Sequence, residues 1–336
     1  MNCYPSPLLP LVPPGVALVD LHCPRFWASA PSMARYIRQR RPDAVMAAMP
    51  LANAIAGYAR NLARIPLRLV LSEHNYRSIA FGDIDRPRDA VLAPFIRIGY
   101  RFADAIVAVS HGVAERLRRT RGVRSERVRV VYNPAYSPRI EALALEPTPH
   151  PWLEDVSTPV VIGSGRLEAQ KDFQTLLEAF AILRTTRPAR LIILGEGSQR
   201  SALEERARQL NVAPHVALPG FVVNPWAYMS RAAVFALSSV HEGLGNVIVE
   251  ALALGTPVVS TDCLSGPAEI LAQGRFGALV ETRDTRALAR AISHAIDAPV
   301  QKAALQRRAR EFSIEAASSG YLNAFGFGES AQGARS

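Results

Sequence analysis

The fold of this chain is decided by residues 238–262, which read SSVHEGLGNVIVEALALGTPVVSTD. A polar turn leads into two glycines and then into an apolar run of helical length. Gly255-Thr256-Pro257 ends that run, because a glycine followed closely by a proline stops a helix. The apolar, β-branched residues that start at Val258 predict a buried strand directly after it.

Two carboxylates lie on either side of the predicted helix start. Glu242 precedes the first turn, where free backbone N–H groups and the helix dipole favour an anion. Glu250 lies inside the apolar run, and we expect it to have a partner because an unpaired buried charge is costly. The arrangement suits a phosphate flanked by hydroxyl-bearing sugars. The alternative is an ordinary helix with a solvent-facing glutamate.

Residues 242–260, EGLGNVIVEALALGTPVVS, resemble the E-x7-E signature of the retaining, glycogen-synthase-like glycosyltransferases of family 4. In that family the first glutamate contacts the donor sugar, the backbone amides after it hold the diphosphate, and the second glutamate binds the ribose. The resemblance runs from about residue 160 to the C-terminus and is looser before it. It assigns these roles to Glu242, to the amides of Gly243, Leu244, Gly245, Asn246 and Val247, and to Glu250.

Composition is that of an ordinary globular protein with room for two domains. The chain has 336 residues, of which 49% are hydrophobic, enough for two domains of about 150 residues each. No apolar run reaches the roughly 18 residues that cross a bilayer, and the N-terminus lacks the basic region of a signal peptide. Three cysteines without C-x-x-C spacing favour a reducing cytosol. We therefore expect a cytoplasmic protein.

Alternating strands and helices predict a parallel α/β sheet in each half of the chain. Strands are expected at 15–21, 43–49, 67–71, 105–109 and 127–132, and then at 160–162, 191–194, 216–218, 233–237, 258–260 and 276–280. Helices are expected at 32–41, 51–63, 86–102, 173–183, 201–210, 285–296 and 300–318, among others. A proline-rich linker, 134–159, separates the halves. The prediction is two Rossmann-like domains, 1–150 and 151–336, that face a central cleft (the GT-B fold).

The loop Gly163-Ser-Gly-Arg-Leu-Glu-Ala-Gln-Lys171 follows a predicted strand and precedes a helix, where open α/β folds bind ligands. Gly165 allows close backbone approach, and Arg166 and Lys171 can together neutralise a diphosphate without a metal. The family uses its G-x-G-R…K loop in this way. The alternative is two solvated surface cations. The sequence contains no carboxylate cluster that demands Mg²⁺, and we expect neither a metal nor a cofactor beyond the nucleotide sugar.

Further candidates rest mainly on the resemblance. In similar proteins, loops after two other strands shape the pocket for the nucleotide base and the sugar, although such loops taken alone are ordinary turns. His74 ends a strand in the N-terminal half, where resembling enzymes place a histidine that faces the donor sugar; a lone histidine is otherwise structural or solvated. Trp226 is most simply a packing residue. The loop candidates are Gly195, Gly197, Phe221 and Val222.

The N-terminal half departs from the family pattern. Family members begin with a strand and a glycine-rich loop, which residues 1–14 do not contain, as if about fifty residues were absent. We therefore expect a complete donor half and an incomplete acceptor half. The whole net charge of +10 also lies in residues 1–150, which hold 21 arginines and lysines against 11 acids. Arginines beside Ile37 and Leu117 could rest on an anionic membrane surface, unless arginine bias is genomic.

These features predict a retaining glycosyltransferase that moves a hexose from a nucleotide-diphosphate sugar, with a UDP-sugar favoured. The expected acceptor is a glycan or a lipid-linked molecule, the expected location is the cytoplasm or the inner face of its membrane, and nucleic acid is not an expected partner. Two alternatives stay open. One is a truncated nucleotide-sugar-binding remnant without turnover, and the other is a UDP-sugar 2-epimerase of the same architecture.

Overall fold

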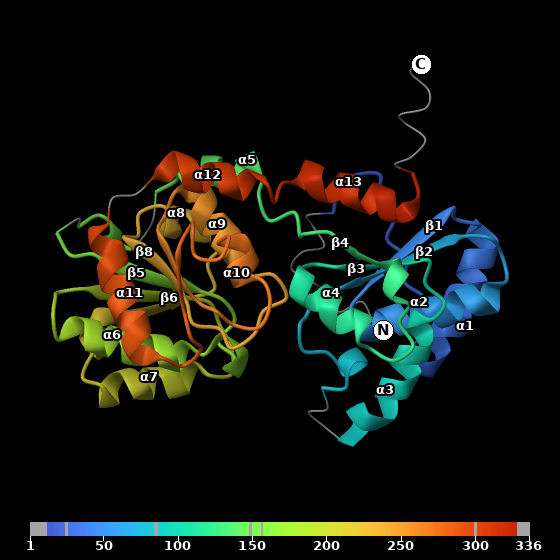
Figure 1. The fold of residues 1–336 in the computed structure, drawn as a ribbon, viewed down its shortest axis with the longest axis horizontal. Coiled ribbons are helices and arrows are strands. Elements are labelled where there is room, and N and C mark those ends of the chain that lie inside the picture. Colours follow the sequence, from blue (N-terminus) through green and yellow to red (C-terminus); the bar gives the residue numbers. More distant parts are fainter. Residues whose placement is uncertain are drawn as a thin grey trace, which may run out of the picture. The chain divides into compact units, whose positions relative to one another are not determined.

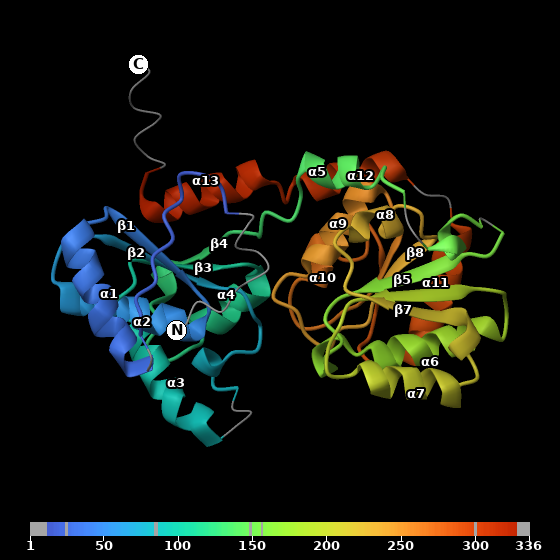
Figure 2. The ribbon, with the colours of Figure 1, turned by 180° about the vertical axis from the view of Figure 1, so that it is seen from behind.

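The chain folds into two α/β units, which Figure 1 and, from behind, Figure 2 draw as ribbons. The computed structural model describes residues 12–23, 26–83, 87–147, 150–155, 157–298 and 301–327. Among these described residues, the first unit takes those within 12–108, 114–129 and 321–327, and the second takes those within 109–113 and 130–320.

This division differs from the predicted boundary at residue 150. The proline-rich segment that was expected as a linker contains a helix, α5 (Pro138–Leu143), which packs on helices of the second unit. The Asn224 side-chain amide donates to the Leu143 carbonyl at 2.8 Å and so fastens this segment further. Residues 130–147 are therefore part of the second unit, and the described residues from Tyr321 onward are part of the first.

The first unit is built on a parallel sheet with the strand order β1-β2-β3-β4. The middle of strand β2 is apolar because strands of a parallel sheet are covered on both faces; Leu69, Val70 and Leu71 are 0% exposed. The strands are β1 (Ala44–Ala48), β2 (Arg68–Glu73), β3 (Ala105–Ala108) and β4 (Val128–Val130), and the helices of this half are α1 (Phe26–Arg40), α2 (Pro50–Ala63), α3 (Pro87–Tyr100) and α4 (His111–Arg118).

Helices α2 and α3 pack unusually close to each other. A Cβ atom added to Gly57 would lie 2.2 Å from the Gly99 carbonyl oxygen, and one added to Gly99 would lie 2.6 Å from the Ala54 Cα. Small residues at this crossing let the two backbones touch. As a result, Asn53 of α2 and Tyr100 of α3 both reach the carboxyl end of β2.

The second unit is a six-stranded parallel sheet with the order β10-β9-β8-β5-β6-β7. Helices α6, α7 and α11 cover one face and share a core with its strands, whereas α8 and α9 lie on the other face (Figures 1 and 2). The strands are β5 (Val160–Ser164), β6 (Arg190–Leu194), β7 (Val216–Gly220), β8 (Val234–Leu237), β9 (Val258–Thr261) and β10 (Ala278–Val280), and the helices are α6 (Phe173–Arg184), α7 (Arg200–Gln209), α8 (Pro225–Met229), α9 (Asn246–Leu254), α10 (Pro267–Ile270), α11 (Thr285–Asp297) and α12 (Lys302–Arg310).

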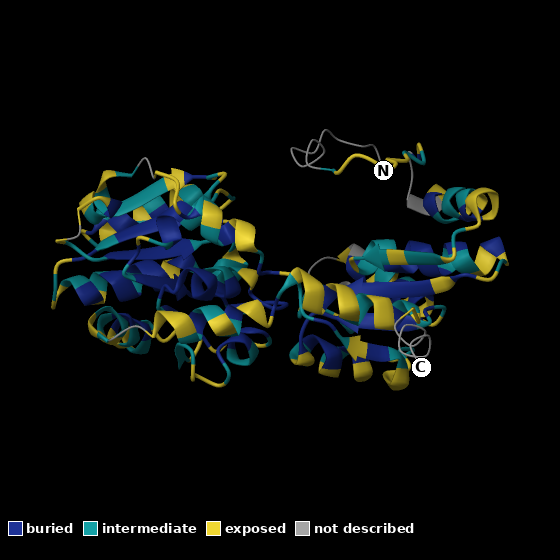
Figure 3. Cartoon of the chain, turned by 90° about the horizontal axis from the view of Figure 1, so that it is seen from above, coloured by how far each residue is buried: buried dark blue, intermediate teal, exposed yellow. Residues whose placement is uncertain are grey.

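Figure 3 shows that the inner strands of both units are mainly buried, while the helices alternate between buried and exposed residues. Two parallel α/β units confirm the predicted fold class. No helix among the described residues is both long enough and apolar enough to cross a bilayer.

Two element predictions are wrong. Residues 16–20 form no strand, and Val16 and Leu18 are 57% and 64% exposed, because no strand of the sheet lies beside them. The predicted helix 300–318 is two helices, α12 and α13 (Ile314–Phe325). The break lies where the Tyr136 amide bonds to the Phe312 carbonyl at 3.0 Å, and the Ser313 hydroxyl then accepts the Ala316 amide of the new helix.

The predicted membrane-facing residues also need a correction. Ile37 and Leu117 are 1% and 0% exposed, so both belong to the protein core and neither can enter a lipid surface. Their arginine neighbours remain exposed, including Arg35, Arg38 and Arg118. These two side chains therefore add no apolar area to the basic surface of the first unit.

Candidate functional site

The predicted loops of the second unit all leave the carboxyl ends of its strands. Residues 165–171 follow β5, 195–199 follow β6, 221–224 follow β7 and 238–245 follow β8. Because the strands are parallel and neighbouring, these loops meet at one edge of the sheet. This is the edge at which open α/β sheets bind ligands.

Glycines let three of these loops touch through their backbones. The Gly165 amide donates to the Leu194 carbonyl at 2.9 Å, and the Gly195 amide donates to the Gly220 carbonyl at 2.8 Å. A Cβ atom at position 195 would lie 1.9 Å from the Gly165 carbonyl oxygen, and one at Gly197 would lie 2.4 Å from the Leu167 oxygen. The spacing of the loops therefore requires glycine at both positions.

A pocket of about 300 Å³ opens beside these glycines. It brings together five of the predicted site residues, contributed by the loops after β5, β6 and β7. The Phe221 ring is 77% exposed at this pocket, and the Arg166 side chain is also exposed. The lining residues are Ser164, Gly165, Arg166, Leu194, Gly195, Glu196, Phe221, Val222 and Pro225.

Lys171 and Glu242 form a largely buried ion pair. The Lys171 Nζ atom donates to Glu242 Oε1 at 2.5 Å, and the two side chains are only 16% and 9% exposed. The Ser239 hydroxyl donates to the same carboxylate oxygen at 2.7 Å. The sequence predicted both residues for the site but not their pairing. Removing either partner would leave the other charge buried and unpaired.

The loops that carry this pair are fastened to each other by further hydrogen bonds. The Ser238 hydroxyl donates to the Lys171 carbonyl at 2.8 Å. The Val240 amide donates to the Gln170 carbonyl, and the Gln170 side chain donates to the His241 carbonyl, each at 2.9 Å. These contacts fix the position of Lys171 relative to the start of α9.

Helix α9 begins at a buried glycine turn. Residues 242–245 are buried and Asn246 is exposed, while Gly245 precedes the helix with a φ of 95°, a conformation that favours glycine. The Ser265 hydroxyl donates to the Gly243 carbonyl at 3.0 Å. The turn therefore holds the first amides of α9 at the same sheet edge as the Lys171–Glu242 pair.

Glu250 has the partner that the sequence required. The Trp226 indole N–H donates to Glu250 Oε2 at 2.9 Å. Burial raises the pKa of the Glu250 carboxyl, while this hydrogen bond and the positive charge of Lys171 lower it. The prediction that Trp226 only packs was incomplete. The indole N–H of Trp226 could have indicated a hydrogen-bond partner, because a buried indole N–H usually finds an acceptor.

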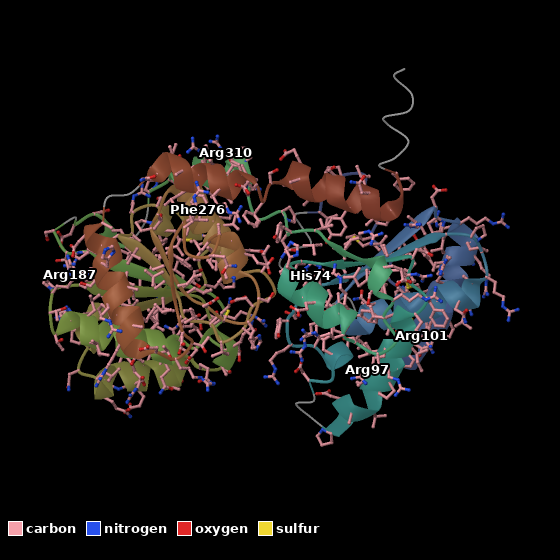
Figure 4. All side chains as sticks on the ribbon, viewed as in Figure 1. His74, Arg97, Arg101, Arg187, Phe276 and Arg310 are labelled. Atoms are coloured by element: carbon pink, nitrogen blue, oxygen red, sulfur yellow. The ribbon has the colours of Figure 1, made fainter. Side chains whose placement is uncertain are left out.

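His74 lies at the carboxyl end of β2 in the first unit, and Figure 4 labels it there. Its Nε2 atom is 2.9 Å from the Ser72 hydroxyl. The preceding residue, Glu73, is 0% exposed and accepts a hydrogen bond from the Tyr100 phenol at 2.5 Å. Asn53 in turn donates to the Tyr100 oxygen at 2.9 Å. No motif in the sequence pointed to these three polar groups.

The described residues contain no group of three or more His, Cys, Asp or Glu side chains that could hold a metal ion. The charged groups at the sheet edge of the second unit include Arg166, Lys171, Glu196, Glu242 and Glu250.

Two parallel Rossmann-like units, with ligand loops at the carboxyl ends of the strands, define the GT-B class of protein. Residues 148–312 match the family described as "Glycosyl transferases group 1", and residues 4–135 match "Glycosyltransferase Family 4". The chain belongs to the family 4 glycosyltransferases, as the E-x7-E resemblance predicted.

Curated relatives and solved structures agree with this assignment. The chain is 35% identical over 228 residues to the lipopolysaccharide core biosynthesis glycosyltransferase LpsE of Rhizobium meliloti. The matched region covers 66% of this chain and 64% of LpsE. It is also 35% identical over 188 residues to an N-acetylgalactosaminyltransferase of Campylobacter jejuni that acts on a diphospho-undecaprenol-linked sugar. That matched region covers 55% of this chain and 49% of the relative. The chain thus spans 49% and 64% of the lengths of these two relatives, in each case less than two thirds.

Two solved structures share the fold. The lipopolysaccharide outer core galactosyltransferase WaaB superposes with a TM-score of 0.69 at 23% identity, covering 89% of this chain and 79% of WaaB. HepE of Anabaena, in a complex with UDP-glucose, superposes with a TM-score of 0.71 at 21% identity, covering 88% of this chain and 81% of HepE.

The pairing of Trp226 with Glu250 predicts a coupling between their substitutions. Trp226→Phe removes the N–H donor and leaves the half-buried Glu250 Oε2 atom without it, which we expect to cost about 1–3 kcal/mol of unfolding free energy. In a Glu250→Ala background the same change should cost less, by a coupling energy of about 0.5–3 kcal/mol. Urea unfolding of the four proteins measures this difference; equal costs in the two backgrounds would contradict the pairing.

Glu73 predicts a dependence of stability on pH. Burial raises the pKa of its carboxyl from 4.5 to about 7, although the Tyr100 hydrogen bond lowers it. The folded protein therefore holds this proton more tightly than the unfolded chain. Its contribution to stability is present below pH 4.5 and is lost as the pH rises to about 7, by at most about 3 kcal/mol.

We expect Glu73→Gln, which mimics the protonated acid, to flatten this part of the pH profile and to be more stable than the wild type at pH 8. Urea unfolding between pH 4.5 and 8 measures it. The exposed Glu115 provides the control substitution, Glu115→Gln, which should leave the slope unchanged. A wild-type profile that rises with pH, parallel to that of Glu73→Gln, would show that Glu73 is ionised throughout.

Proposed function

We propose that this protein is a retaining glycosyltransferase that transfers a hexose from a nucleotide-diphosphate sugar to a glycan or lipid-linked acceptor. The observation that carries the proposal is the buried Lys171–Glu242 pair just before α9, with Glu250 eight residues after Glu242 and on α9 itself. These groups lie at the ligand-binding edge of the sheet, together with the pocket that Arg166 lines.

The diphosphate of the donor would lie against the first turn of α9. Free amides and the helix dipole favour an anion there, and the glycines at 243 and 245 present the backbone without side chains. The Lys171–Glu242 pair has no net charge, so the additional positive charge comes from Arg166. Lys171 still has N–H donors beyond the one that Glu242 accepts, because an ammonium group carries three.

The base and the ribose of the nucleotide would occupy the neighbouring pocket. Its volume of about 300 Å³ and its lining of glycine backbone, Phe221 and Val222 suit a planar ring bound through backbone groups. Glu250 would accept the ribose hydroxyls. Its Oε2 atom already accepts the Trp226 N–H, which orients the carboxylate and leaves the other oxygen for the ligand.

During transfer, negative charge grows on the leaving diphosphate. Arg166, Lys171 and the start of α9 would stabilise this charge, and fixed donors in a partly buried site do so more strongly than water does. Glu242 would contact the sugar, and His74 would donate to a sugar hydroxyl or the phosphate from the first unit. In this proposal the reaction needs no metal ion, since side-chain cations and amides supply the positive charge.

The comparisons support the substrate classes. HepE, similar in fold, has been solved with UDP-glucose, which favours a UDP-sugar as the donor. By its name, LpsE acts in lipopolysaccharide core biosynthesis. The name of the Campylobacter transferase gives a sugar linked to diphospho-undecaprenol as its acceptor. Both names favour a glycan or lipid-linked acceptor. The exposed arginines of the first unit would attract an anionic membrane surface where such acceptors reside, by about 1 kcal/mol each at most.

The diphosphate role predicts a selective loss of affinity in Arg166→Ala. A charge-assisted hydrogen bond is worth about 1.5–3 kcal/mol, so the variant should bind UDP about 10- to 100-fold more weakly. Its affinity for uridine should stay close to that of the wild type. Calorimetric titration with both ligands measures the difference.

Arg286→Ala is a suitable control, because Arg286 is an exposed arginine on α11 of the same unit. This control should bind both ligands as the wild type does. Equal losses for UDP and uridine in Arg166→Ala would remove Arg166 from the diphosphate site.

A further inference from the structure

The C-terminal part of α13 belongs to the first unit, although it follows the whole second unit in the sequence. The Arg68 guanidinium, at the start of β2, donates to the Ala324 carbonyl at 3.2 and 3.3 Å. This contact fastens the last turn of α13 to the strand that ends next to His74. The arrangement places Tyr321 of α13 within reach of the carboxyl end of β2.

Tyr321, Ser72 and His74 form a chain of hydrogen bonds. The Tyr321 phenol oxygen is 3.1 Å from the Ser72 hydroxyl oxygen, and this hydroxyl is 2.9 Å from His74 Nε2. Ser72 is 0% exposed. Side chains two residues apart on a strand point to the same face, which explains why Ser72 and His74 meet on the side that α13 covers.

The opposite face of β2 is held independently. Because successive side chains of a strand alternate between its faces, Glu73 lies on the face opposite to Ser72, where it accepts the Tyr100 hydrogen bond. Asn53 donates to the Ser72 carbonyl at 2.9 Å, which fixes the backbone of the same residue. The strand end is therefore held from α2 and α3 on one face and from α13 on the other.

The chemistry of the three groups gives this chain a direction. A phenol is a stronger acid than an aliphatic hydroxyl, so Tyr321 is the better donor and Ser72 accepts from it. The single hydroxyl hydrogen of Ser72 then goes to His74 Nε2. Because the partner of one ring nitrogen decides where the proton of a neutral imidazole lies, His74 would carry its hydrogen on Nδ1.

We infer that Ser72 and Tyr321 are positioning residues that hold the His74 imidazole in one orientation and in the Nδ1–H tautomer for sugar transfer. The catalytic part of this inference rests on the proposed function, in which His74 contacts the donor. The hydrogen-bond chain from Tyr321 through Ser72 to His74 rests on contacts within the first unit. Helix α13 thereby helps to hold the side chain of His74 at the end of β2.

The test combines the side-chain ¹⁵N NMR spectrum of histidine with steady-state kinetics on the full chain. The His74 signals are assigned by their loss in His74→Gln. In the wild type we expect shifts of the Nδ1–H tautomer. Tyr321→Phe and Ser72→Ala should each shift the ring toward a mixture of tautomers, with a larger change for Ser72→Ala.

The kinetic expectation is a fall in kcat by roughly 10- to 100-fold, because small misplacements of a catalytic group have effects of that size. The KM for the UDP-sugar should change little, since the nucleotide would be held by the second unit. Leu322→Ala is the matched control: Leu322 is next to Tyr321 on α13 and is 49% exposed. It should leave both the tautomer and kcat unchanged.

Two results would overturn the proposed hydrogen-bond chain from Tyr321 through Ser72 to His74. One is an Nε2–H tautomer in the wild type, and the other is an unchanged tautomer in both Tyr321→Phe and Ser72→Ala. A changed tautomer with an unchanged kcat would overturn the part of this hydrogen-bond chain in transfer. Failure of the wild type to transfer sugar from any UDP-hexose would contradict the proposed function instead, because the NMR measurement does not depend on turnover.

Discussion

The buried ion pair between Lys171 and Glu242 is the interaction on which the site of the second unit depends. Two charges withdrawn from water are stable together only where the geometry is good and further hydrogen bonds complete it. Ser239 provides such a bond to the carboxylate. The influence of this charge extends to Cys263, whose thiol pKa is raised to about 12, first by burial and then by the negative charge of Glu242. This raised pKa keeps the Cys263 thiol protonated near neutral pH.

The pair also connects the local structure to the ligand chemistry. It joins the loop after β5 to the loop after β8, and the second loop becomes α9 only because Gly245 adopts a left-handed conformation before it. Once α9 begins at that point, Glu250 faces the indole of Trp226. In the proposed function, this one arrangement would hold a phosphate at the helix start and a sugar beside each carboxylate. Glycine packing at positions 195 and 197 closes the neighbouring loops against each other.

Features with a local signal were predictable from the sequence. Apolar runs of strand length gave the parallel strands, and Gly255 with Pro257 gave the end of α9. The cost of an unpaired carboxylate implied a partner for Glu250 but could not name it, because Trp226 is distant in the sequence. The same limit applies to Tyr100 and Asn53, which reach Glu73 only through the close packing of α2 on α3.

Non-local packing also decided the wrong predictions. The apolar residues 15–21 have the composition of a strand but no neighbour in the sheet. The helix predicted at 300–318 is interrupted by a contact with Tyr136, which no spacing within 300–318 reveals. No pattern within α13 indicates that its last turn packs on β2 of the first unit. These outcomes depend on contacts between segments that are distant in the sequence. Such contacts leave no pattern within any one segment.

Hydrogen–deuterium exchange of the full chain, with and without UDP, tests the central claim most directly. If a diphosphate binds at the start of α9, UDP should slow exchange in the peptides that contain residues 243–250 and 165–171. Peptides from α7, on the far face of the sheet, should be unaffected. Binding of UDP with unchanged exchange in both loop peptides would contradict the account.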